Sequence, residues 1–165
     1  METNVIVKRN DELDLNEVDT FDKILLSPGP GLPSEAGLMP EIIRQFSSTK
    51  SILGICLGMQ AIGEFAGAKL KNLSTVKHGL SEPIVHLEND NIFRNIPVSF
   101  NVGRYHSWVI DEIDLPKELI ITARDREGNI MAIQHRRMML RGIQFHPESI
   151  LSQFGKEIIE NWLAE

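Results

Sequence analysis

Cysteine is almost absent from this chain, since Cys56 is the only one among 165 residues. A single cysteine cannot form an internal disulfide, so we expect a reducing compartment and, by default, the cytoplasm. No apolar run is long enough to span a bilayer. The first residues, METNVIVKRND, lack the apolar core of a signal peptide. These absences argue against a disulfide-rich secreted protein and against a membrane-spanning one.

Positive charge is also scarce. The chain has 17 Lys and Arg against 23 Asp and Glu, which gives a net charge of −6. Phosphate backbones are bound by basic surfaces, so this balance argues against nucleic acid as the main partner. Hydrophobic residues make up 42% and charged residues 24%, as is ordinary for a globular protein of one domain with a real core.

The first half alternates two kinds of pattern. Apolar, β-branched runs predict short strands, and apolar residues at helical spacing predict helices between them. The expected strands are 4–7, 23–27 and 51–56, and the expected helices are 35–47 and 60–66. This order favours a parallel sheet with crossover helices.

The second half is richer in strand-like runs separated by turn signals. The expected strands are 83–87, 100–109, 119–123, 130–134 and 141–145, and a final helix is expected at 152–163. We see no repeat and no linker. The sequence therefore predicts an α/β fold in one domain over 1–165, with a strand-rich second half.

The stretch ILGICLGMQAIG places Cys56 between an apolar run and a helix-like stretch. A strand that turns sharply into a helix presents its turn residue at the carboxyl edge of the sheet. We expect Gly54 and Gly58 to let the backbone bend and to leave room for a ligand. The N–H of Leu57, at a helix N-terminus, could lower the thiol pKa and donate to an oxyanion. The alternative is a buried structural cysteine, and this stretch alone leaves both open.

The stretch GIQFHPES carries a second candidate. Pro147 forces His146 into an extended conformation, so that His146 and Glu148 share one face. The carboxylate could then orient the imidazole while the other ring nitrogen serves as a base. The alternative is a solvated strand end, which becomes less favoured in a chain that also has a cysteine at a strand–helix turn.

The loop SPGPGLP, residues 27–33, is a third and weaker candidate. A Pro/Gly alternation after a strand exposes backbone N–H groups that could grip a carboxylate or an oxyanion. An ordinary tight turn is the alternative. No pair of the remaining histidines has metal-ligand spacing, so we predict no metal.

Four stretches together resemble the class I glutamine amidotransferase family: LSPGPGLPSEAG, ILGICLGMQAIGE, VGRYHSWVID and GIQFHPESILS. They follow the family's order and cover nearly the whole chain. The resemblance implies a flavodoxin-like fold with a central, mostly parallel sheet flanked by helices.

The resemblance also implies a mechanism in which Cys56 attacks the side-chain amide of glutamine. His146 would be the base and then the acid, Glu148 would orient it, and the N–H groups of Leu57 and Gly29 would stabilise the oxyanion. The glutamine site implied by the family pattern comprises Gly29, Pro30, Gly31, Leu57, Gln60, Ser107 and Trp108.

Among the subgroups, SPGPGLPSEAG, RYHS and FHPESILS look most like the glutaminase subunit of anthranilate synthase or aminodeoxychorismate synthase. Met59 stands where that subgroup usually has His, and Trp108 stands where the family often has Leu. We expect the first change to be tolerated because the base is His146. The second would be tolerated if the contact at Trp108 is made by its backbone.

The resemblance implies that ammonia passes to a larger, chorismate-binding synthase subunit. We expect this to be the subunit of anthranilate synthase, in tryptophan biosynthesis, and the alternative is that of aminodeoxychorismate synthase, in folate biosynthesis. It implies no cofactor in this chain, with Mg²⁺ only in that partner subunit. Family members begin with a further strand and helix, so we expect the domain to be N-terminally truncated by about one βα unit. Two alternatives stay open: a non-catalytic regulatory subunit, and a cysteine hydrolase of similar fold acting on other amides or esters.

Overall fold

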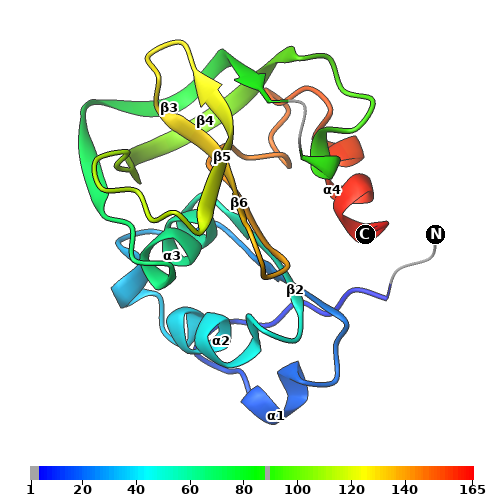
Figure 1. The fold of residues 1–165 in the computed structure, drawn as a ribbon. Helices are drawn as coiled ribbons and strands as arrows, with labels where there is room; N and C mark the ends of the chain where they lie inside the picture. Colours follow the sequence, from blue (N-terminus) through cyan, green and yellow to red (C-terminus); the bar gives the residue numbers. More distant parts are fainter. Residues whose placement is uncertain (1–3, 88–89) are drawn as a thin grey trace.

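A computed structural model describes residues 4–87 and 90–165, which form a seven-stranded sheet flanked by helices (Figure 1). The strands are β1 (Lys23–Leu26), β2 (Ser51–Ile55), β3 (Leu70–His86), β4 (Ser99–Ile110), β5 (Leu119–Asp125), β6 (Ile130–His135) and β7 (Leu140–Ile143). The helices are α1 (Leu15–Val18), α2 (Met39–Phe46), α3 (Leu57–Phe65) and α4 (Gly155–Leu163), with 3-10 turns η1 (Pro33–Glu35) and η2 (Asn91–Phe93). Within the described residues, no helix combines the length and apolarity needed to cross a bilayer.

The strand order is β1-β2-β7-β6-β5-β3-β4. β1, β2 and β7 pair in parallel, whereas the other neighbours pair antiparallel. The α/β class and the strand-rich second half are therefore confirmed. The sheet is mixed rather than mostly parallel, because four of its six neighbouring pairs are antiparallel. Its parallel part comprises the strands that lead to Cys56 and His146. The carboxyl ends of β2 and β7 meet at one edge, as parallel strands require.

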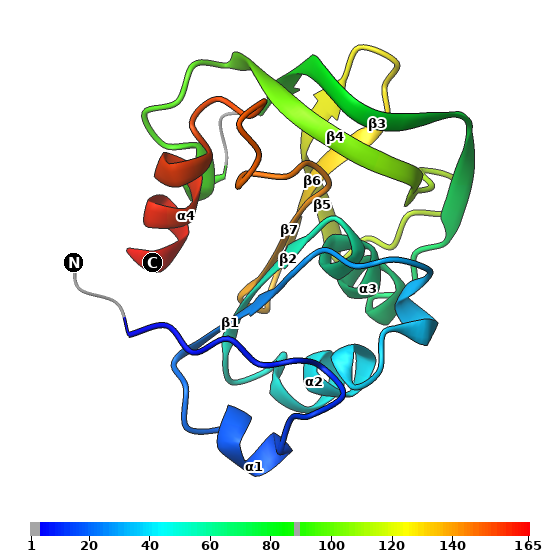
Figure 2. The same cartoon turned by 180° about the vertical axis from the view of Figure 1, so that it is seen from behind.

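Two apolar cores lie on opposite faces of the sheet. Successive strand residues point to opposite faces, so Ile52 joins one core and Leu53 the other, and both are fully buried. The first core contains the apolar faces of α2 and α3, and the second contains Ile158 and Trp162 of α4. Figure 2 shows α4 on the opposite side of the sheet from α2 and α3.

Two strand predictions were wrong. Residues 4–7 do not form a strand, and Val5 and Val7 are 72% and 88% exposed. A β-branched run becomes a strand only where a partner supplies the backbone hydrogen bonds. Conversely, β3 begins at Leu70 rather than at residue 83, because its polar and half-exposed first part pairs with β4 from Leu70 onwards.

The helix predictions were right in place and inexact at the ends. The helix expected at 35–47 starts at Met39, because the chain first forms η1 and then passes through Gly37, whose φ is 56°. The helix expected at 60–66 begins earlier, at Leu57, and the last helix begins at Gly155 rather than at 152. The short helix α1 was not predicted; its N-terminus is capped by the Asp14 side chain.

Candidate active site

Cys56 occupies the sharp turn between β2 and α3, as predicted. Its φ and ψ are 53° and −102°, a conformation that residues other than glycine rarely adopt. Its backbone N–H donates to the Ile143 carbonyl of β7 at 2.8 Å, which fixes the turn to the neighbouring strand. Backbone strain of this kind persists where the surrounding structure imposes it, often at functional sites.

The glycines on either side of Cys56 permit close packing. A Cβ on Gly54 would meet the Gly58 carbonyl and lie 2.5 Å from Met59 N, and a Cβ on Gly58 would lie 2.5 Å from Leu26 O. Neither glycine has a positive φ. The expectation that they bend the chain and leave room for a ligand was therefore wrong. They let the backbones of β1, β2 and α3 approach one another.

The strain at Cys56 predicts an unusual order of stability. We expect the free energy of unfolding of Cys56→Gly to be about 1 kcal/mol higher than that of Cys56→Ala. The positive φ costs a Cβ-bearing residue roughly 1–3 kcal/mol, which exceeds the burial gained from one methyl group. Urea denaturation of the two variants measures the difference. A more stable alanine variant would show that the turn is not strained.

The Cys56 thiol is only 7% exposed. Burial raises its pKa to about 11, and the negative charge of Glu148 adds to that rise. The Leu57 N–H and the Gln144 side chain act in the opposite direction, because both donate toward the sulfur. The resting thiol is therefore protonated at neutral pH and needs a base to become a nucleophile.

This raised pKa predicts the pH dependence of alkylation in the chain alone. A thiol reacts as the thiolate, whose fraction rises about tenfold per pH unit below the pKa. We expect the iodoacetamide rate at Cys56 to climb throughout pH 7–10 without a plateau, since the pKa is about 11. The rate is measured by quenching the alkylation at set times and recording the mass of the intact protein. A plateau near pH 8 would contradict the burial of the thiol.

His146 and Glu148 form the predicted pair. The Nδ1 atom of His146 lies 2.7 Å from Oε1 of Glu148. Its Nε2 is buried and has no hydrogen-bond partner among the described residues. The carboxylate accepts a hydrogen bond from the Nδ1–H group, and in the neutral ring this leaves the lone pair on Nε2, as a general base requires. The His146 N–H also donates to Gly103 O at 3.1 Å, which joins this turn to β4.

One face of β4 lies against His146. The Tyr105 ring packs edge-on against the imidazole with centroids 4.9 Å apart, and its hydroxyl lies 3.0 Å from Ser149 Oγ. Since alternate strand residues share a face, Ser107 lies on the same side of β4 as Tyr105. The structure thus brings the predicted Ser107 to the face that His146 occupies. Sequence reasoning missed Tyr105, although its place two residues before Ser107 indicates the shared face.

The loop after β1 reaches the start of α3. A Cβ on Gly29 would lie 3.0 Å from Leu57 Cδ2, so Gly29 and Leu57 are neighbours, as the oxyanion prediction requires. Gly29, Pro30 and Gly31 are exposed. The Leu32 N–H donates to the Glu35 carboxylate at 2.9 Å, which holds the exposed loop against η1.

The remaining predicted residues, Gln60 and Trp108, contact each other. Gln60 is buried, and its NH₂ group donates to the Trp108 carbonyl at 2.9 Å and to Gln144 Oε1 at 3.2 Å. The Trp108 backbone carbonyl is thus bonded to Gln60 inside the protein. Met59 is fully buried and faces β7, where a Cβ on Gly142 would lie 2.7 Å from Met59 Cγ. The departure at Met59 therefore falls in the core and away from the thiol.

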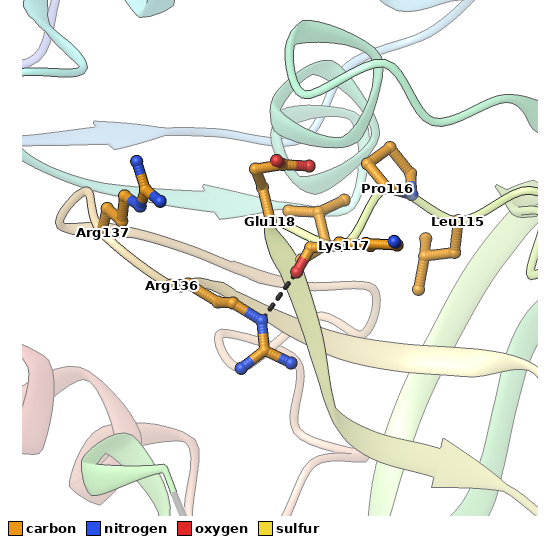
Figure 3. Close-up of a pocket in the computed structure, with 7 residues that line it drawn as sticks. Leu115, Pro116, Lys117, Glu118, Arg136 and Arg137 are labelled. Carbon is orange, nitrogen blue, oxygen red and sulfur yellow. Dashed lines mark hydrogen bonds between the residues drawn. The ribbon is translucent and has the colours of Figure 1, made fainter.

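Two surface hollows lie elsewhere and contain none of the predicted site residues. The larger, about 490 Å³, is lined by Leu115, Pro116, Lys117, Glu118, Leu119, Arg136 and Arg137 (Figure 3). Its shape is held in part by Arg136 Nε, which donates to Lys117 O at 2.6 Å. It offers no nucleophile beside a base. Across residues 4–87 and 90–165, no three His, Cys, Asp or Glu side chains converge as metal ligands would.

Comparison with known proteins shows the family of the chain. Residues 1–165 match the family Glutamine amidotransferase class-I. The chain is 42% identical over 163 residues to anthranilate synthase component 2 of Pyropia yezoensis, covering 97% of this chain and 86% of that protein. It is also 42% identical over 162 residues to aminodeoxychorismate synthase component 2 of Escherichia coli, with the same coverage.

A solved structure gives the same result for the fold. The crystal structure of a protein from Thermoplasma acidophilum, described as a GMP synthase subunit, superposes with a TM-score of 0.82 at 28% identity. The match covers 94% of this chain and 77% of that one. The chain belongs to the class I glutamine amidotransferases.

Proposed function

We propose that this chain hydrolyses L-glutamine and delivers the ammonia to a chorismate-using synthase subunit. The observation that carries the proposal is the strained Cys56 at a helix N-terminus, on the same sheet edge as a His146 whose Nε2 is left free by Glu148. In the proposed function, His146 is the base that supplies the activation that the raised thiol pKa demands.

The proposed reaction begins when His146 Nε2 takes the thiol proton. The Cys56 sulfur then attacks the amide carbon of glutamine, and the N–H groups of Leu57 and Gly29 donate to the oxyanion. The imidazolium returns the proton to the amide nitrogen, and the C–N bond breaks to release ammonia.

Water completes the cycle. His146 takes a proton from water, which attacks the glutamyl thioester, and the proton passes to the Cys56 sulfur as the C–S bond breaks. Glutamine and water thus become glutamate and ammonia. Glu148 stabilises the imidazolium in both halves of the reaction, because its carboxylate oxygen lies 2.7 Å from Nδ1 and accepts a hydrogen bond from it.

Two partner enzymes are candidates. The first is the larger subunit of anthranilate synthase, in tryptophan biosynthesis. The second is that of aminodeoxychorismate synthase, in folate biosynthesis, which the equal 42% identity to the Escherichia coli component 2 supports.

The test mixes the chain with each larger subunit from its own organism, together with chorismate and glutamine. We expect glutamate release to be coupled to one aromatic product, anthranilate or aminodeoxychorismate, and the product identifies the pathway. Binding of a larger subunit without glutamate release would favour the non-catalytic regulatory alternative. Release of acid from other amides or esters, but not from glutamine, would favour the general hydrolase.

A further inference from the structure

Gln144 contacts the nucleophile and has no role in the mechanism above. It follows β7 directly and is fully buried. Its side-chain nitrogen lies 3.4 Å from Cys56 Sγ, and its side-chain oxygen lies 3.2 Å from Gln60 Nε2. It is therefore placed to act on the sulfur, provided that its NH₂ group, and not its oxygen, faces the thiol.

The Trp108 carbonyl determines which way both amides point. A backbone carbonyl can only accept, so the Gln60 group 2.9 Å from Trp108 O must be the NH₂. The second N–H of that NH₂ needs an acceptor, and Gln144 Oε1 supplies it. With its oxygen directed at Gln60, Gln144 must direct its NH₂ at the Cys56 sulfur. A rotated Gln144 would set two NH₂ groups against each other.

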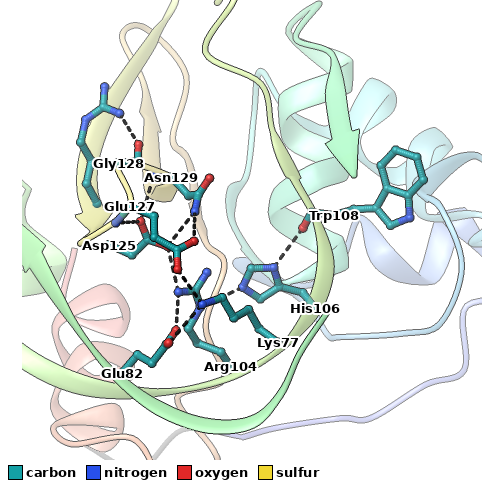
Figure 4. A network of polar contacts seen from close by, with 10 residues as sticks. Lys77, Glu82, Arg104, His106, Trp108, Asp125, Glu127, Gly128 and Asn129 are labelled. Carbon is teal, nitrogen blue, oxygen red and sulfur yellow. Dashed lines mark hydrogen bonds and ion pairs between the residues drawn. The ribbon is translucent and has the colours of Figure 1, made fainter. Parts of the chain in front are cut away.

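His106 is a second partner of the Trp108 carbonyl. Arg104 Nε lies 3.3 Å from His106 Nε2, and an arginine N–H can only donate, so Nε2 accepts. The ring proton then lies on Nδ1 and donates to Trp108 O at 3.1 Å. Burial and the Arg104 charge lower the pKa of His106 to about 4, which keeps this neutral tautomer at physiological pH. Figure 4 shows this part of the chain of contacts.

Arg104, at the end of this series of contacts, is held by ion pairs. Arg104 is 1% exposed, and its Nη1 lies 2.6 Å from Glu82 and 2.8 Å from Asp125 (Figure 4). Lys77 adds a second cation on Glu82, at 3.1 Å. Because a buried guanidinium held by two carboxylates has little freedom, the donor at His106 is fixed in place.

We propose that Gln144 is a positioning residue for Cys56, and that Gln60 and the Trp108 carbonyl hold its amide with the NH₂ toward the sulfur. The N–H donation favours one rotamer of the Cys56 side chain and stabilises the thiolate relative to the thiol. The proposal rests on the proposed function only in taking Cys56 to be the nucleophile.

The test uses the single cysteine of the chain, since iodoacetamide modification of a thiol then reports Cys56 alone. The groups that act on this thiol are the Leu57 N–H, the Glu148 charge and Gln144. Gln144→Met keeps the length of the side chain and removes the donor. We expect alkylation between pH 7 and 9 to slow by roughly three- to tenfold, because the thiol pKa rises while the intrinsic nucleophilicity of the thiolate increases only partly in compensation.

A second variant separates positioning from simple loss of packing. Gln144→Met alone leaves a buried Gln60 N–H without its acceptor, which also destabilises the fold. The double variant Gln60→Met/Gln144→Met removes both polar groups, so we expect its melting temperature to recover toward wild type while alkylation stays slow. Gln134→Met, on the neighbouring strand β6, is the matched control and is expected to alkylate at the wild-type rate.

The outcomes decide between the two roles. Slow alkylation in both Gln144 variants, with normal rates in the control, supports positioning. Alkylation that recovers together with stability in the double variant would overturn it, as would a wild-type rate in Gln144→Met. The assay contains no glutamine, so its result stands apart from glutamine hydrolysis. Wild-type chain that releases no glutamate with either larger subunit would defeat the proposed function and leave this comparison unaffected.

Discussion

Cys56→Ser is expected to lower the rate of glutamate release by at least about a thousandfold. The hydroxyl is a far weaker nucleophile than a thiolate, and removing the nucleophile from such a site costs a factor of this order or more. Steady-state glutamate release, measured with the larger synthase subunit present, gives the ratio.

The same variant supplies its own control. Ser differs from Cys by one atom, so we expect the fold and the contact with the synthase subunit to persist. Product formation from chorismate and free ammonia should then continue at the wild-type rate. Loss of the ammonia-driven reaction would indicate a folding or assembly defect. Glutamate release at more than about a tenth of the wild-type rate would contradict Cys56 as the nucleophile.

Gly54→Ala is expected to lower the free energy of unfolding by at least about 3 kcal/mol, the largest stability effect we predict. The new methyl group would meet the Gly58 carbonyl and lie 2.5 Å from Met59 N, both in the backbone of α3. A flexible side chain could turn away, but here the start of the helix must move. Because Cys56 lies between the two glycines, we also expect glutamate release to be lost.

Gly128→Ala is the matched control. Gly128 lies in the turn between β5 and β6 with a φ of 84°. Apart from its two chain neighbours, no described residue has an atom within 4 Å of the position that a Cβ would take. Its substitution therefore costs only backbone strain, about 1 kcal/mol. Chemical denaturation of both variants gives the comparison. Equal losses would show that strain, and not the contact between β2 and α3, limits this part of the fold.

The parallel part of the fold and the two chemical motifs were predictable because their signals are local. A short apolar run that ends at Cys56 before a helical pattern specifies a strand–turn–helix by itself. Pro147 likewise determines the backbone of His146, so the pairing of His146 with Glu148 followed from spacing alone. The role of Gly54 and Gly58 was not predictable in this way: they allow close approach of backbones rather than leave room for a ligand.

The first part of β3 and the role of Gln144 were not predictable for the opposite reason. The polar residues from Leu70 onwards form a strand because β4 lies beside them, and their partners there are about 30 to 40 residues away in the sequence, as in the pair of Leu70 with Ile110. Gln144 shares the extended segment of His146, which indicates a common face. Its orientation, however, depends on Trp108 and Arg104 of β4, which only the folded chain brings close.

Covalent labelling of Cys56 by a glutamine analogue is the most direct test of the central claim. The analogue carries an electrophilic diazoketone in place of the side-chain amide, and peptide mass spectrometry locates the adduct. We predict one adduct, on Cys56, that excess glutamine prevents and that Cys56→Ser abolishes. No adduct in the presence of either larger subunit, from a chain whose Cys56 still reacts with iodoacetamide, would contradict a glutaminase.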